Sequence, residues 1–171
     1  MTGLNRRDVV GGLVLAGGAL SASPAAAAPS VLKLSELKKE ADVACLYHCD
    51  FGDPKRFSQM MRNIANHMSV YGSNPLELQL AVVAHGMGLK FFLDNLSGTP
   101  WQADEPVSAL FESVENAAKT GLKVYLCNMT FENLKIDRDK ARKADFIEVV
   151  PSGVATVAAL QSKGFAYLKT G

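Results

Sequence analysis

The chain has 171 residues, of which 48% are hydrophobic and 20% are charged, and its formal net charge is +1 at pH 7. This length fits a short signal segment followed by one domain with a single core. The 18 basic and 17 acidic residues form no long run of one sign, so the chain lacks the basic patch typical of proteins that bind nucleic acid or an anionic membrane surface.

Residues 1–27 have the pattern of an export signal peptide. Asn5-Arg6-Arg7-Asp8 precedes a weakly apolar run over 9–22 that is rich in glycine and alanine, and Ser23-Pro24 and four alanines follow it. Paired arginines before such a run indicate the twin-arginine route, and the run is too short to cross a membrane. We predict cleavage after Ala27 and a periplasmic mature domain, 28–171. The alternative is an uncleaved anchor.

Three cysteines remain after cleavage: Cys45, Cys49 and Cys127. In an oxidising compartment an odd number leaves at least one thiol that is free, modified or paired with another molecule. Cys45 and Cys49 cannot readily pair on one extended strand, where their Cα atoms lie about 13 Å apart. A disulfide between Cys49 and Cys127 stays open.

The first predicted element is a buried strand over 43–49, a nearly continuous apolar run. Asp53 as N-cap and Pro54 at the first helical position then predict a helix to about Tyr71, which Gly72 ends. The predicted core face of that helix consists of Phe57, Met60, Met61, Ile64, Ala65 and Met68.

Residues 76–84 alternate at first and end as a continuous apolar run, which predicts a second strand entering the sheet from a solvated edge. A second helix is expected over 106–120, ended by Gly121, and a third strand over 122–127. The remaining predicted elements are a short basic helix over 137–143, a strand over 146–150, a helix over 154–162 and a last strand over 165–168.

Strands that alternate with helices predict an α/β fold, a three-layer α/β/α sandwich on a mostly parallel five-stranded sheet. We expect the doubly wound, flavodoxin-like strand order 2-1-3-4-5. In that order the first strand lies between the second and the third. Open parallel sheets bind ligands beyond the carboxyl ends of their strands, so we expect the site there.

Residues that could take part in catalysis or binding lie at the carboxyl ends of three predicted strands. His48 and Cys49 end the first, His85 follows the second, and Cys127 with Asn128 ends the third. Cys127 is the leading candidate, because the amide dipoles of a following turn favour the nucleophilic thiolate. It could attack a sulfane sulfur and hold it as a persulfide, with His48 or His85 accepting the thiol proton.

Other interpretations of the same residues stay open. Cys127 could simply be a small apolar residue at the end of a buried strand. Cys49 could resolve Cys127 as a disulfide, or join it and a histidine, His48 or His85, in a zinc or copper site, or pack in the core. The spacing matches no known metal signature, so we predict neither a metal nor a cofactor.

The turn His85-Gly86-Met87-Gly88 offers backbone groups to a ligand in the cleft. Its two glycines let amides approach whatever binds there, although this short pattern alone is no phosphate signature. Together with Asn128, Gly86 and Gly88 are therefore the candidate binding positions. His67 is expected on the surface of the first helix.

Three segments follow the predicted strands: Ala84 to Leu89 after the second, Cys127 to Thr130 after the third, and Val150 to Ala155 after the fourth. Their order and spacing resemble the DsrE/DsrF-like family. Leu160-Gln161 and the segment from Gly164 to Tyr167 resemble the exported members of the family. The resemblance thus covers essentially the whole mature chain.

The resemblance implies an α/β/α sheet and assembly into homo-oligomers such as trimers or hexamers, or into mixed rings. In the best understood members a cysteine carries persulfide sulfur, and the matching position here is Cys127. Those members are cytoplasmic, so an exported version would need other partners, for instance carriers of a periplasmic sulfur-oxidation pathway.

The function predicted from the residues and the resemblance together is periplasmic binding or relay of sulfane sulfur within oxidative sulfur metabolism, by a candidate sulfurtransferase. The expected partners are further copies of this chain and a sulfur donor or acceptor, either a protein or a small sulfur compound. We expect no nucleic acid and, after cleavage, no membrane. The alternatives are a non-enzymatic homo-oligomeric binding or assembly module and a Cys/His metal-binding protein.

Overall fold

The structure is a computed structural model that describes residues 29–170. The predicted signal peptide, 1–27, lies outside the described residues. Within 29–170, no helix is both long enough and apolar enough to cross a membrane.

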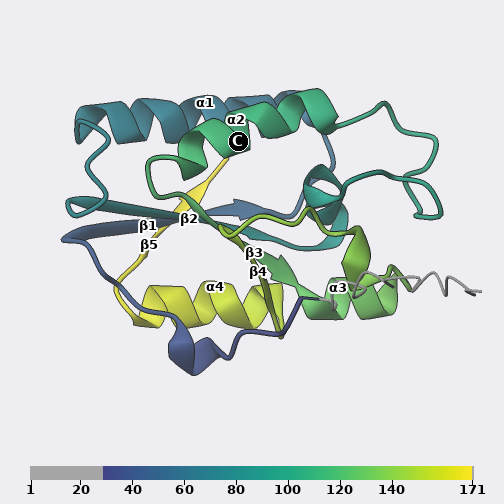
Figure 1. Cartoon of the computed structure of the whole chain (residues 1–171). Helices are drawn as coiled ribbons and strands as arrows, with labels where there is room; N and C mark the ends of the chain where they lie inside the picture. The colour runs from purple at the N-terminus through teal and green to yellow at the C-terminus, as the bar shows by residue number, and fades with distance from the viewer. Residues whose placement is uncertain (1–28, 171) are drawn as a thin grey trace, which may run out of the picture.

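Five parallel strands form one sheet in the order β4-β3-β2-β1-β5 (Figure 1). The strands are β1 (Val43–Cys49), β2 (Leu78–Ala84), β3 (Lys123–Cys127), β4 (Ile147–Val150) and β5 (Ala166–Lys169). Each lies within two residues of its predicted bounds. The predicted α/β class, with a five-stranded parallel sheet between helical layers, is confirmed.

Two helices cover one face of the sheet and a third covers the other face, as Figure 1 shows. α1 (Pro54–Val70) and α2 (Ser108–Ala118) lie side by side above the sheet, and α4 (Gly153–Ser162) lies below it. α3 (Asn128–Asn133), which the sequence did not predict, begins directly after β3. The remaining short segments are the 3₁₀ helices η1 (Leu34–Glu36), η2 (Gly86–Phe92) and η3 (Arg138–Lys140). The basic helix predicted over 137–143 is only the single turn η3.

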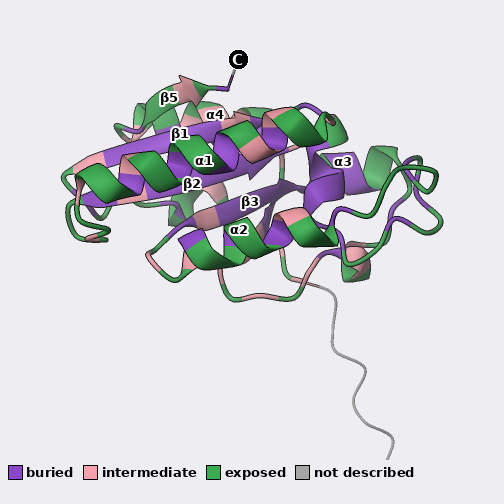
Figure 2. Ribbon diagram, turned by 90° about the horizontal axis from the view of Figure 1, so that it is seen from above, coloured by how far each residue is buried: buried purple, intermediate pink, exposed green. Residues whose placement is uncertain are grey.

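The predicted strand order 2-1-3-4-5 is wrong, because β2 lies between β1 and β3 and β1 lies beside β5. β2 is buried at six of its seven positions, as a strand with neighbours on both sides must be. β5 is largely exposed and forms the edge beside β1, as Figure 2 shows. Successive right-handed crossovers in one direction place α1 and α2 on the same face, and the return crossover places α4 on the other.

The first helix begins and ends where the sequence predicts. The Asp53 side chain accepts a hydrogen bond from the Lys55 amide at 2.8 Å, and Gly72, with φ of 58°, lies in the left-handed region just beyond the helix end. Five of the six predicted core positions are buried. Ala65 is exposed instead, on the side of α1 that borders the groove toward α2.

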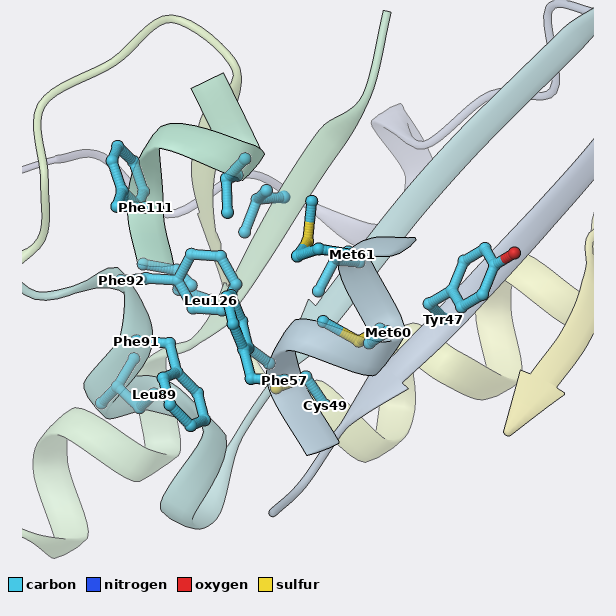
Figure 3. Close-up of a cluster of buried hydrophobic side chains, with 14 of the residues drawn as sticks. Tyr47, Cys49, Phe57, Met60, Met61, Leu89, Phe91, Phe92, Phe111 and Leu126 are labelled. Atoms are coloured by element: carbon cyan, nitrogen blue, oxygen red, sulfur yellow. The ribbon is translucent and has the colours of Figure 1, made fainter. Parts of the chain in front are cut away.

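The sheet divides the core in two. The larger part, here called the α1-side core, contains Cys45, Tyr47 and Cys49 of β1, and Figure 3 shows Cys49 beside Phe57 in it. The smaller part, the α4-side core, contains Ala44 and Leu46 of the same strand. Because successive residues of a strand point to opposite faces, this alternation also decides which face each strand-end residue occupies.

Candidate functional site

Three of the predicted site residues point to the α4 face at the carboxyl edge of the sheet. Leu46 and Val83 belong to the α4-side core, and His48 and His85 follow each of them by two residues. In β3, Tyr125 belongs to the α4-side core and Leu126 to the α1-side core, so Cys127 also points to the α4 face. β2 is the middle strand, and the order across the sheet is therefore Cys127, His85, His48.

His48 and His85 contact each other directly. Their Nε2 atoms are 2.6 Å apart and their ring centroids are 4.8 Å apart, with the rings tilted by 43°. A contact of this length between two ring nitrogens is a hydrogen bond in which one imidazole donates and the other accepts. The adjacent strands β1 and β2, whose register pairs His48 with Val83, hold the two rings in this position.

Tyr167 extends the contact from His48 to the edge of the sheet. Its hydroxyl lies 2.9 Å from His48 Nδ1, and the two rings meet edge to face at a centroid distance of 5.7 Å. Tyr167 is absent from the predicted site, because the predicted strand order places the last strand far from the first. The pairing of β5 with β1 brings it there.

The first residue of α4 fixes the position of His85. A Cβ atom on Gly153 would lie 2.8 Å from His85 Cβ and 2.9 Å from its Cδ2, so only glycine leaves room for the ring here. Ser152 caps the helix by accepting a hydrogen bond from the Ala155 amide at 3.3 Å. The Val-Pro-Ser-Gly segment after β4 therefore packs α4 against the histidine.

Cys127 ends β3 as a free thiol and is the residue immediately before α3. Its pairing partner on β4 is Val150, and on the other side the ladder between β2 and β3 ends at Ala84 and Leu126, one residue before His85 and Cys127. The side chain is 5% exposed but belongs to neither apolar core cluster. Cys127 therefore lies at the boundary between the core and the strand-end loops.

Cys49 lies on the opposite face from Cys127. It is fully buried in the α1-side core, and Gly88 packs so closely that a Cβ there would be 2.0 Å from the Cys49 carbonyl oxygen. Burial, reinforced by the nearby Asp50 carboxylate, raises the pKa of the Cys49 thiol far above its ordinary value. The structure therefore does not bring Cys49 together with Cys127, and a resolving or metal-binding role of Cys49 stays a prediction. Cys45 lies on the same face as Cys49 and is also buried.

The three candidate binding positions in the turns are already engaged within the chain. The Gly86 amide donates to Thr130 Oγ1 at 3.0 Å, and the Gly88 amide donates to the His85 carbonyl oxygen at 3.0 Å. The Asn128 side-chain amide donates to the Glu132 carboxylate at 2.7 Å. These contacts hold the turn after His85 against α3, and the ligand-binding role of the three positions stays a prediction.

Charges near His48 oppose one another. Burial lowers the pKa of His48, Asp50 acts in the opposite direction, and the His85 ring and the Arg56 guanidinium lower it further. Burial favours a neutral His48, which can then take part in hydrogen bonds as donor and acceptor at once.

His67 lies apart from this arrangement. Its Nδ1 is 3.2 Å from the hydroxyl of Tyr47, a residue of the α1-side core, and burial lowers the pKa of His67. Among residues 29–170, no group of three or more His, Cys, Asp or Glu side chains is arranged to hold a metal ion.

A groove of about 540 Å³ lies between α1 and α2 on the far side of the sheet from the histidine pair. Its apolar lining includes Met61, Met68 and Leu110. The groove is therefore not part of the candidate site at Cys127 and the two histidines.

Comparison with known proteins gives a family and a fold. None of the curated proteins compared with the chain matches it. Among solved structures, a protein of unknown function, MTH1491 from Methanobacterium thermoautotrophicum, superposes with a TM-score of 0.58 and 22% identity, covering 75% of this chain and 99% of that chain. At this identity the likeness shows a shared fold. The sequence model of the DsrE/DsrF-like family matches residues 15–170, a range that includes the strand ends with His48, His85 and Cys127, and the chain therefore belongs to the DsrE/DsrF-like family.

Proposed function

We propose that the protein binds and relays sulfane sulfur as a persulfide on Cys127, as a sulfurtransferase of oxidative sulfur metabolism. The observation that carries the proposal is the placement of a free strand-end thiol on the same sheet face as His85, with β2 and β3 adjacent. Membership of the DsrE/DsrF-like family supports a role of the sulfur-relay kind.

The chemistry needs a nucleophile and a group that accepts its proton. No hydrogen bond joins Cys127 to His85 among the described residues, so the thiol proton passes through one water to His85 Nδ1, the ring nitrogen that His48 does not contact. The thiolate attacks the outer sulfur of a donor persulfide, so that a new S–S bond forms on Cys127. The donor's own S–S bond breaks, and the donor leaves as a thiolate that takes up a proton. Attack by an acceptor thiolate on the Cys127 persulfide reverses these steps.

The proposed setting is the periplasm, after cleavage of the predicted signal peptide, with the mature chain in a homo-oligomer of the trimer or hexamer type. Donor and acceptor are then small sulfur compounds or proteins of that compartment. Amino-terminal sequencing of protein recovered from the periplasm tests the cleavage after Ala27, and light scattering on that material gives the oligomer size.

A second function, a non-enzymatic binding or assembly module, is favoured by one observation. Cys127 is only 5% exposed, and so a sulfur donor reaches it only if the strand-end loops move. Thiol titration separates the two functions. If Cys127 reacts with a thiol reagent only after denaturation, the protein is an assembly module and the cysteine is structural.

The sulfur-relay function is tested by exposing reduced mature protein to thiosulfate, polysulfide or a small persulfide, followed by peptide mapping by mass spectrometry. We expect one or more added sulfur atoms on Cys127 that reductant removes. Cys127→Ser must abolish the addition, and Cys45→Ser, at a buried position on the other face, must keep it. Absence of added sulfur on Cys127 with every donor would refute the proposal.

A further inference from the structure

The contacts at the site form a continuous chain of three side chains with two open ends. The Tyr167 hydroxyl contacts His48 Nδ1 at 2.9 Å, and His48 Nε2 contacts His85 Nε2 at 2.6 Å. At one end Tyr167 is 39% exposed on the edge strand β5. At the other end His85 Nδ1 has no hydrogen-bond partner among the described residues, and it is not one of their buried unpaired atoms.

Hydrogen-bond chemistry allows this chain only two neutral arrangements. A neutral imidazole carries one proton, and the close Nε2 contact requires a single proton between the rings. In the first arrangement Tyr167 donates to His48 Nδ1, His48 donates through Nε2, and His85 Nδ1 carries a proton. In the second, His85 donates through Nε2, His48 donates from Nδ1 to the Tyr167 oxygen, and His85 Nδ1 is an unprotonated base. A change at either end therefore changes all three groups.

We propose that Tyr167, His48 and His85 form a proton relay. It connects His85 Nδ1, on the α4 face to which Cys127 also points, with solvent at Tyr167. In this relay Tyr167 and His48 are positioning residues that decide whether His85 Nδ1 accepts or donates a proton. The relay rests on the proposed function only for the source of the proton, the thiol of Cys127.

The relay balances in both directions. When His85 Nδ1 takes the thiol proton, the Nε2 proton of His85 moves to His48 Nε2, and the positive charge moves to His48. His48 then releases its Nδ1 proton to the Tyr167 oxygen while the Tyr167 hydroxyl proton leaves to water. The second neutral arrangement has thereby become the first, and His85 Nδ1 now carries the proton that an unloading step consumes. Water accepts one proton in loading and returns it in unloading.

The charged groups around His48 and His85 include both signs. This suits a positive charge that stays on the two rings only briefly. Asp50 stabilises a positive charge on His48, whereas Arg56 and His85 oppose it. Lys169, exposed on β5 in register with His48, adds another positive group, and α4, which packs on His85 through Gly153, contributes no charged side chain. The contact disfavours a positive charge on both rings at once, because both Nε2 atoms would then carry a hydrogen into the same 2.6 Å contact.

The test is a pH titration of the histidine ring nitrogens by NMR on ¹⁵N-histidine-labelled protein in its native assembly. The chain has three histidines, so His67→Gln identifies the third signal. We expect His48 and His85 to change together on uptake of a single proton, while His67 titrates separately. Tyr167→Phe removes the hydroxyl and should shift the midpoint of both site histidines by about half a pH unit or more.

Tyr71→Phe is the matched control, because Tyr71 lies beside a histidine, His67, at a centroid distance of 5.8 Å and away from the pair. It should leave the His48 and His85 signals unchanged. The pH profile of sulfur loading should shift with Tyr167→Phe and stay in place with Tyr71→Phe.

Three results would overturn the relay: independent titration of His48 and His85, unchanged signals of both in Tyr167→Phe, or a metal ion found bound by both Nε2 atoms in purified protein. The NMR measurement needs no sulfur donor, and its failure is therefore distinct from failure of the proposed function. A coupled titration in a protein whose Cys127 never loads would support the relay and refute Cys127 as its proton source.

Discussion

The Cα of Gly153, the first residue of α4, lies against the ring of His85, so closely that a Cβ atom on Gly153 would be 2.9 Å from His85 Cδ2 and 3.1 Å from Cγ. Real Cβ atoms essentially never approach another heavy atom within 3.0 Å, and the atoms that would have to move belong to the imidazole rather than to a flexible chain end. The helix α4 thus determines where His85 can lie.

Gly153→Ala should therefore displace His85 and weaken its contact with His48. We expect overpacking to cost about 1–3 kcal/mol of unfolding free energy, reduced by the better helix propensity of alanine, which is worth about 1 kcal/mol. Urea unfolding measures the net change, and ¹⁵N shifts of His48 and His85 report the loss of the contact. Val154→Ala, at an exposed neighbouring position, is the control. Unchanged histidine shifts in Gly153→Ala would contradict the packing.

Thr130→Val should loosen the turn after His85. The Thr130 hydroxyl accepts the Gly86 amide at 3.0 Å, and valine keeps the shape of the side chain while it removes the acceptor. An amide left without its partner should cost about 1–3 kcal/mol. Amide hydrogen exchange at Gly86 should become faster, whereas exchange in the middle of β2 should not. Equal protection of Gly86 in both proteins would show that the hydroxyl does not hold the turn.

Cys49→Ser and Cys127→Ser should differ in which property they change. Cys49 is fully buried in an apolar core, and a serine hydroxyl there should cost about 1–3 kcal/mol of stability while sulfur loading of the folded protein persists. Cys127→Ser should abolish loading. Denaturant unfolding and mass spectrometry on the same two variants check both effects. Loss of loading in folded Cys49→Ser would bring Cys49 back into the chemistry.

Mild acid should destabilise the fold through its histidines. Burial lowers the pKa of His48 and of His67 below the ordinary value of 6.5, so below that value the unfolded chain binds protons that the folded chain does not. The contribution of these groups to stability is complete above 6.5 and is lost as the pH falls from there through their lower folded values. We expect unfolding free energy to fall between about pH 7 and about pH 5.5.

His48→Gln should show a smaller fall over the same range, because one of the two proton-binding groups is gone. His67→Gln should show its own smaller fall while the His85 signal stays unchanged. Unfolding curves in urea at several pH values give the slopes. A stability that rises on mild acidification of the wild-type protein would reverse the sign and contradict the burial of the two rings.

Local patterns predicted the elements well because their causes are local. The ends of α1 are determined within the segment itself, by the Asp53 cap, Pro54 and the left-handed Gly72. Each observed strand likewise lies in the apolar run that predicts it. Strand order depends on which surfaces pair across the sheet, and the polar start of the second strand fits the edge position that the predicted flavodoxin-like order gives it. Its continuous apolar end was the better signal, because only a central strand is buried on both faces.

The candidate site, too, could be predicted where it depends on local patterns and could not where it depends on strand order. His48, His85 and Cys127 could be predicted because parallel strands place their carboxyl ends at one edge, whatever their order. Tyr167 could not, since it joins the site only through the pairing of β5 with β1. Cys49 lies on the other face from His48 because successive residues of a strand point to opposite faces, and this alternation can be recognised in the sequence itself. α3 was missed because six residues give too short a pattern.

Whether Cys127 carries sulfur is best measured on protein that has been exposed to its own donors in the cell. Mature protein recovered from the periplasm without reductant should be measured intact and then mapped by peptide mass spectrometry, before and after reduction. We expect a population with extra sulfur on Cys127 alone, which reductant removes and a sulfane-sulfur donor restores. A Cys127 that is unmodified as isolated, and that stays unmodified with every donor while the protein remains folded, would contradict it.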